Sequence, residues 1–303
     1  MTSHAARLPG LGMETRAAIA AAVAGVLVGA AIVATRFVID QTTPAALAFL
    51  RYLIGLLCLL PVLTIARRAH IAPRDLLPVA LLGIGQFGIL IVLLNYGLTL
   101  IPSARAALIL SSFPLLTLML AVSIGIERFT WRVALGVLAT IAGVALALGD
   151  KLETASPVAV SFLGEGAVLA AAFTGALCSV FYGTYLRRYP VLPVSVLAMF
   201  ASVLFLGAVA AWEGFFAGWP RFTPGGWAAV VFIGVGSGVG YYLWLWALTH
   251  TSPTRVTVFL CLSPVTAAVL GALLLAEPVS LLLVAGVASI GTGLWLTHSH
   301  RHG

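Results

Sequence analysis

The chain has 303 residues, of which 61% are hydrophobic and only 8% are charged. Soluble domains carry about 25% charged residues, so this composition excludes a soluble protein and indicates an integral membrane protein. The formal net charge of +7 does not indicate nucleic-acid binding, because the arginines lie in short loops between apolar runs, where membrane insertion favours them.

The first 16 residues are polar, and a full-length apolar run follows them up to about residue 38. This run is too long for the core of a cleaved signal peptide, so we interpret it as a retained membrane span. A spanning helix needs about 20 mostly apolar residues, and ten windows of the sequence meet that requirement. They run approximately over 17–38, 44–66, 76–98, 104–126, 131–149, 165–186, 194–216, 227–248, 254–276 and 280–297. The predicted fold is therefore an all-α integral membrane protein with ten transmembrane helices.

The distribution of basic residues predicts the orientation of these helices. With the N-terminus inside, the inner segments hold eleven basic residues and the outer loops hold three, while the last two of the sixteen, Arg36 and Arg51, lie within spans. Cytoplasmic loops of membrane proteins carry an excess of Lys and Arg. We therefore expect a multi-pass protein of the cell inner membrane with both termini in the cytoplasm.

The two halves of the chain match at a fixed offset of 150 residues. Residues 81–148 align with 231–298 without a gap, and each half contains five windows. The coinciding pairs include Arg105/Arg255, Pro114/Pro264, Glu127/Glu277, Gly136/Gly286 and Gly143/Gly293. A unit with an odd number of spans, once duplicated, places its two copies in opposite orientations. We expect two inverted five-helix repeats, 1–149 and 164–303, joined by an external linker over 150–163.

Several kinds of chemistry are excluded or disfavoured. No Asp, Glu, Lys or His lies at the centre of a window, so neither a proton relay nor an intramembrane enzyme is indicated. Glu127 and Glu277 lie at membrane surfaces close to free helix N-terminal amides, which favours a structural role over a coupling role. The three cysteines are widely spaced and form no CxxC pair, so no metal site or disulfide is indicated. The chain also lacks a GxxxxGK[ST] loop, and we expect no cofactor.

Polar uncharged and aromatic residues at mid-depth are the candidates for lining a substrate cavity. Some precede a helix proline, which releases a backbone carbonyl from its hydrogen bond. The candidates are Gln86, Ser111, Ser112, Thr174, Ser179, Tyr182, Ser237, Tyr241, Tyr242, Trp244 and Ser263. Two alternatives stay open, since Ser and Thr often bond back to their own helix and aromatic residues can form an interfacial belt.

A cluster of charged residues is predicted near the outer surface. Arg36 and Arg51 lie in the outer third of the first two spans, and Asp40 follows Arg36 by four residues, so the two can share a helix face. Arg105 opens the fourth span on the same side. These residues either form an external gate or extend to the lipid headgroups.

The order and spacing of several motifs resemble the EamA domain of the drug/metabolite transporter superfamily. In the second half they are residues 247–252 (ALTHTS), residues 262–265 (LSPV), Glu277, Gly286 and Gly293, and the first half repeats them less completely. Within this superfamily, the length and aromatic content are similar to those of bacterial amino-acid exporters of the YddG type. One departure is Val28 before Gly29, where many members carry a tryptophan.

The resemblance implies a secondary transporter that works by alternating access, and not an enzyme. The candidate cavity is neutral, aromatic and rich in hydroxyl groups, which suits small uncharged or zwitterionic solutes. We expect export of aromatic or other neutral amino acids, or of similar small metabolites, across the inner membrane. Efflux of drugs or lipophilic amines and metabolite uptake are alternatives on the same fold, and a passive channel is an alternative of another class. The sequence leaves the oligomeric state open and is compatible with a monomer.

Overall fold

The computed structural model describes residues 12–38, 41–65, 71–101, 103–147, 149, 162–218, 221–275 and 281–298, and the regular secondary structure of these residues is entirely helical. The first half contains α1 (Met13–Arg36), α2 (Pro44–Ile65), α3 (Pro73–Gly83), η2 (Ile84–Ile89), α4 (Leu90–Leu100), α5 (Ser103–Leu110), α6 (Phe113–Ser123) and α7 (Trp131–Ala147). The second half contains α9 (Phe162–Leu186), α10 (Val191–Trp212), η3 (Phe215–Ala217), α11 (Pro224–Leu248), α12 (Pro253–Thr257), η4 (Val258–Cys261), α13 (Leu262–Leu275) and α14 (Leu281–His298).

Most of these helices are suited to a bilayer. Within the described ranges, eight helical segments are long and apolar enough to cross a membrane, and α7 is a shorter apolar helix. The remaining predicted window, 254–276, is occupied by α12, η4 and α13 in succession. Among the described residues, each predicted window thus contains helical segments, because an apolar run of this length can satisfy its backbone polar groups within lipid only by coiling.

Three of the predicted windows contain interruptions. A π-helix, η2, joins α3 to α4, and the backbone turns at Ser111 and Ser112 between α5 and α6. The window 254–276 contains the 3₁₀ segment η4 directly before α13. The last two interruptions precede Pro114 and Pro264, because a proline fits the first turn of a helix but cannot donate the hydrogen bond that would extend the helix through it.

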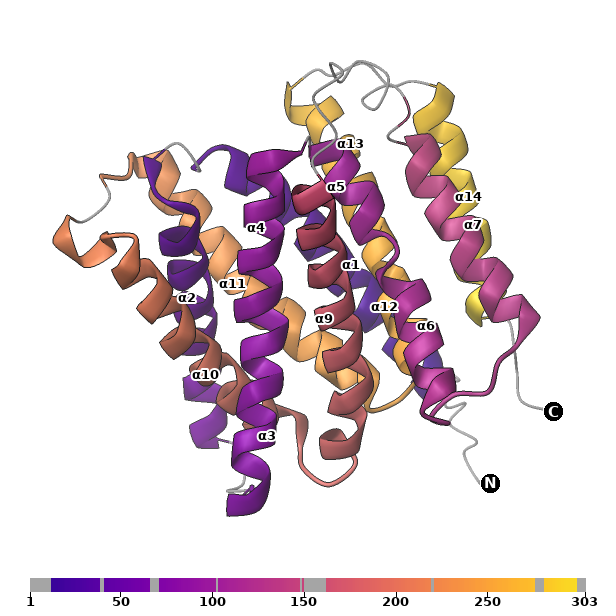
Figure 1. The fold of residues 1–303 in the computed structure, drawn as a ribbon, viewed down its shortest axis with the longest axis horizontal. Coiled ribbons are helices and arrows are strands. Elements are labelled where there is room, and N and C mark those ends of the chain that lie inside the picture. Colours follow the sequence, from indigo (N-terminus) through magenta and orange to yellow (C-terminus); the bar gives the residue numbers. More distant parts are fainter. Residues whose placement is uncertain are drawn as a thin grey trace, which may run out of the picture.

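Glycines allow α7 and α14 to cross with their backbones almost in contact. A Cβ atom added to Gly136 would lie 2.8 Å from the carbonyl oxygen of Gly293, and one added to Gly143 would lie 2.7 Å from that of Gly286. The pairing runs in opposite chain directions, and between the two glycine pairs the Ser289 hydroxyl donates to the Ala139 carbonyl at 2.9 Å. Small residues are what permit such close approach in a membrane. Figure 1 shows the α7–α14 pair standing at one side of the other helices.

Polar contacts tie the two halves of the chain together at both ends of the bundle. At one end Tyr189 donates to Asp75 at 2.6 Å, with Arg188 3.9 Å from the same carboxylate. At the opposite end Gln41 accepts from the Thr223 amide at 2.9 Å. We call the first end the arginine-rich end, because it carries Arg74, Arg128, Arg187, Arg188 and Arg255.

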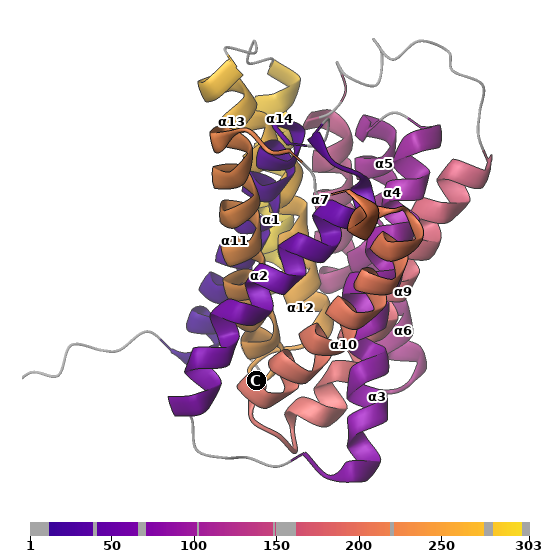
Figure 2. The same cartoon turned by 90° about the vertical axis from the view of Figure 1, so that its left-hand side faces the viewer.

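The starts of α1 and α3 and the ends of α9 and α14 lie at the arginine-rich end (Figure 2). The Arg255 guanidinium there is 4.0 Å from the Glu14 carboxylate at the beginning of α1. Between the two ends lies the principal hydrophobic core, to which α1, α2, α9, α10 and α11 all contribute buried side chains.

Candidate functional site

Four aromatic side chains from four different helices meet in the middle of this core. The Phe87 ring lies 5.0 Å from the Tyr52 ring and 4.3 Å from the Tyr241 ring, measured between centroids. The Tyr241 hydroxyl donates to the Tyr182 hydroxyl at 2.8 Å. We call Tyr52, Phe87, Tyr182 and Tyr241 the aromatic cluster. It joins α2 and η2 of the first half to α9 and α11 of the second, so a relative movement of the halves must rearrange it.

A cation adjoins the aromatic cluster near the middle of α11. The Arg51 Nε–H donates to the Ser237 hydroxyl at 2.5 Å, and Ser237 lies near the middle of α11. The guanidinium carbon is 5.3 Å from the centroid of the Tyr52 ring, a distance at which a cation is attracted to an aromatic face. Arg51 thus points toward α11, and its contact with Ser237 joins a predicted gate residue to a predicted cavity residue.

Four of the predicted cavity residues carry a buried polar atom that has no hydrogen-bond partner. These atoms are Gln86 Oε1, Ser112 Oγ, Ser179 Oγ and Trp244 Nε1. Buried polar groups in proteins are nearly always paired, and an unpaired one costs about 1–3 kcal/mol. Each of the four can therefore form a hydrogen bond with a water or a ligand.

Other predicted hydroxyls bond back to their own helix. Ser111 donates to Leu108 at 2.6 Å, Thr174 to Ala170 at 2.8 Å and Ser263 to Leu260 at 2.8 Å. These contacts follow the alternative that the sequence left open. Tyr242 is half-buried on α11, next to Tyr241.

The predicted external gate is described only in part. Asp40 lies outside the described residues, and the side chains of Arg36 and Arg105 are likewise not described. Of the predicted gate residues, Arg51 has a described side chain, and that side chain contacts Ser237 of α11.

Two members of the aromatic cluster, Tyr52 and Phe87, were not predicted from the sequence. Tyr52 directly follows the intramembrane Arg51, and Phe87 directly follows Gln86. The available signal was this adjacency, since a residue beside a polar intramembrane group is placed at the same depth.

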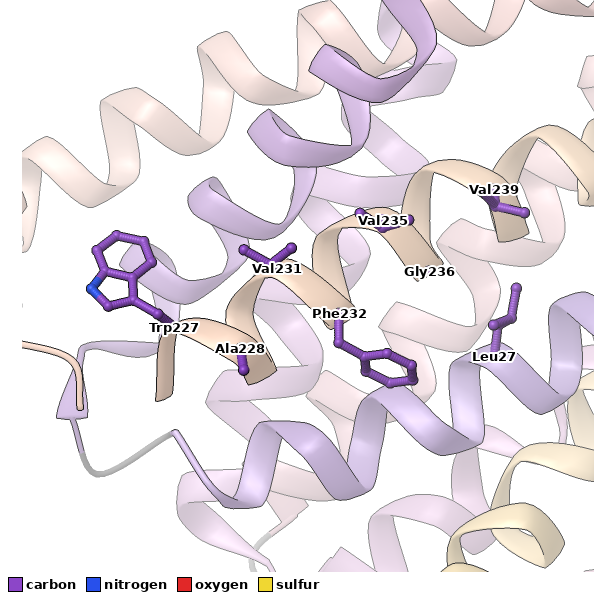
Figure 3. A pocket seen from close by; sticks show the side chains of 8 residues that line it. All are labelled: Leu27, Trp227, Ala228, Val231, Phe232, Val235, Gly236 and Val239. Carbon is purple, nitrogen blue, oxygen red and sulfur yellow. The ribbon is translucent and has the colours of Figure 1, made fainter. Parts of the chain in front are cut away.

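A groove on the surface of the bundle is not part of this site. It has a volume of about 660 Å³ and is walled by apolar side chains of α11 together with Leu27 of α1 (Figure 3). The labelled residues Trp227, Val231, Phe232, Val235 and Val239 follow one exposed face of α11. This face is suited to contact with lipid, whereas Ser237 and Tyr241 lie on the buried face of the same helix.

The arrangement can do two things chemically. The Arg51 guanidinium can bind a carboxylate through paired N–H groups, and the aromatic cluster can pack against an apolar body. Tyr182 is fully buried and Tyr241 is 5% exposed, so the site is shielded from solvent in this conformation.

Comparison with known proteins gives a consistent result. The sequence matches the EamA-like transporter family over residues 15–149 and 162–299. It is 26% identical over 277 residues to an uncharacterized transporter of Archaeoglobus fulgidus, covering 90% of this chain and 95% of that protein. It is 30% identical over 222 residues to a probable terminal-alkyne amino-acid exporter of Streptantibioticus cattleyicolor, covering 72% of this chain and 71% of that protein.

A solved crystal structure has the same fold. It superposes with a TM-score of 0.78 at 23% sequence identity, covering 94% of this chain and 98% of the other.

Proposed function

Because the chain belongs to the EamA-like transporter family, we propose that it is a secondary carrier that exports neutral amino acids, aromatic ones included, by alternating access. The observation that carries this proposal is the position of Arg51, a cation near the middle of α11 beside the aromatic cluster. An ionisable residue at this depth is costly and by default functional. An amino acid offers a carboxylate to the guanidinium and a side chain to the aromatic rings. The resemblance to a probable amino-acid exporter supports the same class of substrate.

The proposed architecture is ten transmembrane helices in two inverted five-helix repeats, 1–149 and 164–303, joined by the external linker 150–163. The crossing of α7 and α14 supports it. At the offset of 150 residues Gly136 corresponds to Gly286 and Gly143 to Gly293. In the crossing Gly136 faces Gly293 and Gly143 faces Gly286, so the two contacts are equivalent under exchange of the halves. Ser289 and Ala139, which also differ by 150, bond to each other. This reciprocity is expected of two equivalent units related by a two-fold axis.

Alternating access requires that the halves separate at one end of the bundle while they stay joined at the other. The described structure has polar ties between the halves at both ends, Asp75 with Tyr189 and Gln41 with Thr223, and encloses the aromatic cluster between them. This conformation corresponds to an occluded state. The concentration of arginines at one end favours placing that end, and both termini, in the cytoplasm.

Counterflow in proteoliposomes tests the proposal. Labelled L-phenylalanine should accumulate faster in liposomes loaded with unlabelled L-phenylalanine, with saturable kinetics. Flux that is linear in concentration would indicate a channel instead. Movement of phenethylamine without movement of any amino acid would indicate an amine carrier and would contradict the proposed substrate.

Removing the unpaired acceptor of Gln86 should weaken substrate binding. If a substrate donor satisfies Gln86 Oε1 during transport, Gln86→Ala should raise KM about fivefold, the equivalent of one ordinary hydrogen bond. The measurement is the concentration dependence of counterflow. Thr292→Ala is the matched control, because the Thr292 hydroxyl is exposed and bonds back to Ala288. If Gln86→Ala and Thr292→Ala have the same KM, Gln86 does not bind the substrate.

A further inference from the structure

A second cavity, distinct from the aromatic cluster, opens at the arginine-rich end. It has a volume of about 350 Å³ and lies between the end of α9, the loop after α6 and the turn that joins α11 to α12. We call it the polar pocket. Its volume is sufficient for a small ligand, since ligand pockets in proteins begin at about 300 Å³.

The walls of the polar pocket combine charges of both signs with an apolar floor. Glu127 from the first half and Arg187 from the second half contribute the charges, and Thr184 and Thr249 add hydroxyl groups at the rim. Val180 and Leu248, which are at most 6% exposed, form part of the floor. A zwitterion with an apolar side chain is complementary to this combination.

The Glu127 side chain is held in a fixed position. Ile126 and Glu127 both donate their backbone N–H to the Ala121 carbonyl, at 2.8 and 3.1 Å, and Gly125, which directly precedes Ile126, has a φ of +78°. This is a closed C-terminal cap of α6, which favours glycine at the left-handed position. Glu127 Oε1 accepts from the Thr254 N–H at 2.9 Å. The sequence placed Glu127 near the start of the helix that follows it, but the structure directs it to α12 in the other half.

Burial raises the pKa of the Glu127 carboxyl, with the hydrogen bonds from Thr254 opposing that effect. An ammonium group that enters the pocket would favour the charged carboxylate and offset this cost of burial.

The polar pocket and the aromatic cluster share the helix α9. Val180 in its floor precedes Tyr182 by two residues on α9, and Tyr182 bonds to Tyr241 in the cluster. A ligand in the pocket would thus contact the helix that carries Tyr182, at the end of the bundle that the proposal places in the cytoplasm.

We propose that the polar pocket is a loading site for zwitterionic amino acids with apolar side chains, in which Glu127 binds the ammonium group and Arg187 binds the carboxylate. This inference rests on the proposed export function. Because the Glu127 carboxylate also holds α12, arrival of an ammonium group competes with the Thr254 N–H and weakens a tie between the two halves.

The test compares the two faces of the carrier. In everted membrane vesicles, which expose the cytoplasmic face, Glu127→Gln and Arg187→Gln should each raise KM for L-phenylalanine about tenfold, the loss expected when a charge-assisted hydrogen bond becomes neutral. In right-side-out vesicles the KM of both variants should stay within about twofold of the wild type. Glutamine at 127 still accepts from Thr254, so the fold is preserved. Glu14→Gln and Arg128→Gln are the matched controls, since both residues are exposed at the same end and do not line the pocket.

Substrate analogues that lack one charged group show which group each of the two residues binds. Glu127→Gln should lose the preference for L-phenylalanine over 3-phenylpropionate, which lacks the ammonium group, and Arg187→Gln should lose the preference over phenethylamine, which lacks the carboxylate. The effects should persist in liposomes of phosphatidylcholine alone, which excludes a phosphatidylethanolamine headgroup as the ligand. An unchanged KM, or an equal change at both faces, would overturn the loading site while leaving the export function intact.

Calorimetry separates failure of the loading site from failure of the export function. If the wild type moves no amino acid, the export proposal fails, and titration of L-phenylalanine into the purified full-length protein still tests the pocket. Binding that is lost in Glu127→Gln but retained in Tyr241→Ala supports the loading site, and binding with the opposite pattern overturns it.

Discussion

Replacing Arg51 by glutamine should lower kcat/KM for amino-acid counterflow by about 30- to 150-fold, because a charge-assisted hydrogen bond to the substrate carboxylate is worth about 2–3 kcal/mol. The guanidinium is held by Ser237 and lies against Tyr52, so its position is defined before the substrate arrives. Arg51→Lys keeps the charge but loses the planar fork of donors, and should fall between the wild type and Arg51→Gln.

Two controls distinguish substrate recognition from a structural role of Arg51. Counterflow of phenethylamine, which has no carboxylate, should be reduced far less by Arg51→Gln than counterflow of L-phenylalanine. The thermal unfolding midpoint in detergent reports any damage to the fold. Loss of both transport activities together with a lowered midpoint would show that Arg51 is needed for packing only.

Substituting alanine for Gly286 should destabilise the protein by about 1–3 kcal/mol, the usual cost of overpacking an already close contact. A Cβ atom at Gly286 would lie 2.6 Å from the Ala147 nitrogen and 2.6 Å from the Gly143 carbonyl oxygen. Both are backbone atoms of α7 and cannot rotate away, so α7 and α14 must move apart. The measurement is the shift of the thermal unfolding midpoint in detergent.

The matched control is Gly291→Ala on the same helix. A Cβ atom at Gly291 would have nothing within 4 Å, and alanine stabilises helices by up to about 1 kcal/mol relative to glycine. The two substitutions should therefore change the midpoint in opposite directions. A second alanine at Gly143 should add little to Gly286→Ala, because both residues belong to one contact. Equal shifts for Gly286→Ala and Gly291→Ala would contradict the tight crossing.

The positions of the helices could be predicted because they depend on local properties of the chain. Apolar length alone defines a span, so the windows over 44–66 and 227–248 agree closely with α2 and α11. The breaks before Pro114 and Pro264 also have a local cause. The π-helix η2 does not, since its counterpart 234–239 in the other half lies within the regular helix α11 at the same alignment register. Tertiary packing selects one helical form in η2 and the other in α11.

The contacts of the candidate site could be predicted only in part. Mid-depth polar residues were identifiable by composition and position, and four of them carry unpaired buried atoms. The partnership of Arg51 with Ser237 spans 186 residues and depends on which faces of α2 and α11 meet. Hydropathy does not encode that choice of face, because both helices are apolar around most of their circumference. For the same reason the sequence predicts Arg51 near the outer surface and Ser237 in the cavity, and does not predict their contact.

The crossing of α7 and α14 also limits how the two halves can diverge over evolutionary time. Each of its four glycines faces the backbone of the other copy, so a mutation in one half alters the surroundings of the equivalent residue in the other half. Gln86 and its counterpart Gly236 are under no such mutual constraint and are free to specialise. A reciprocal contact of this kind can form equally well between two separate copies of one chain. On the proposed architecture of two repeats, this contact is compatible with an ancestor of half the present length, a five-helix protein that paired with an inverted copy of itself.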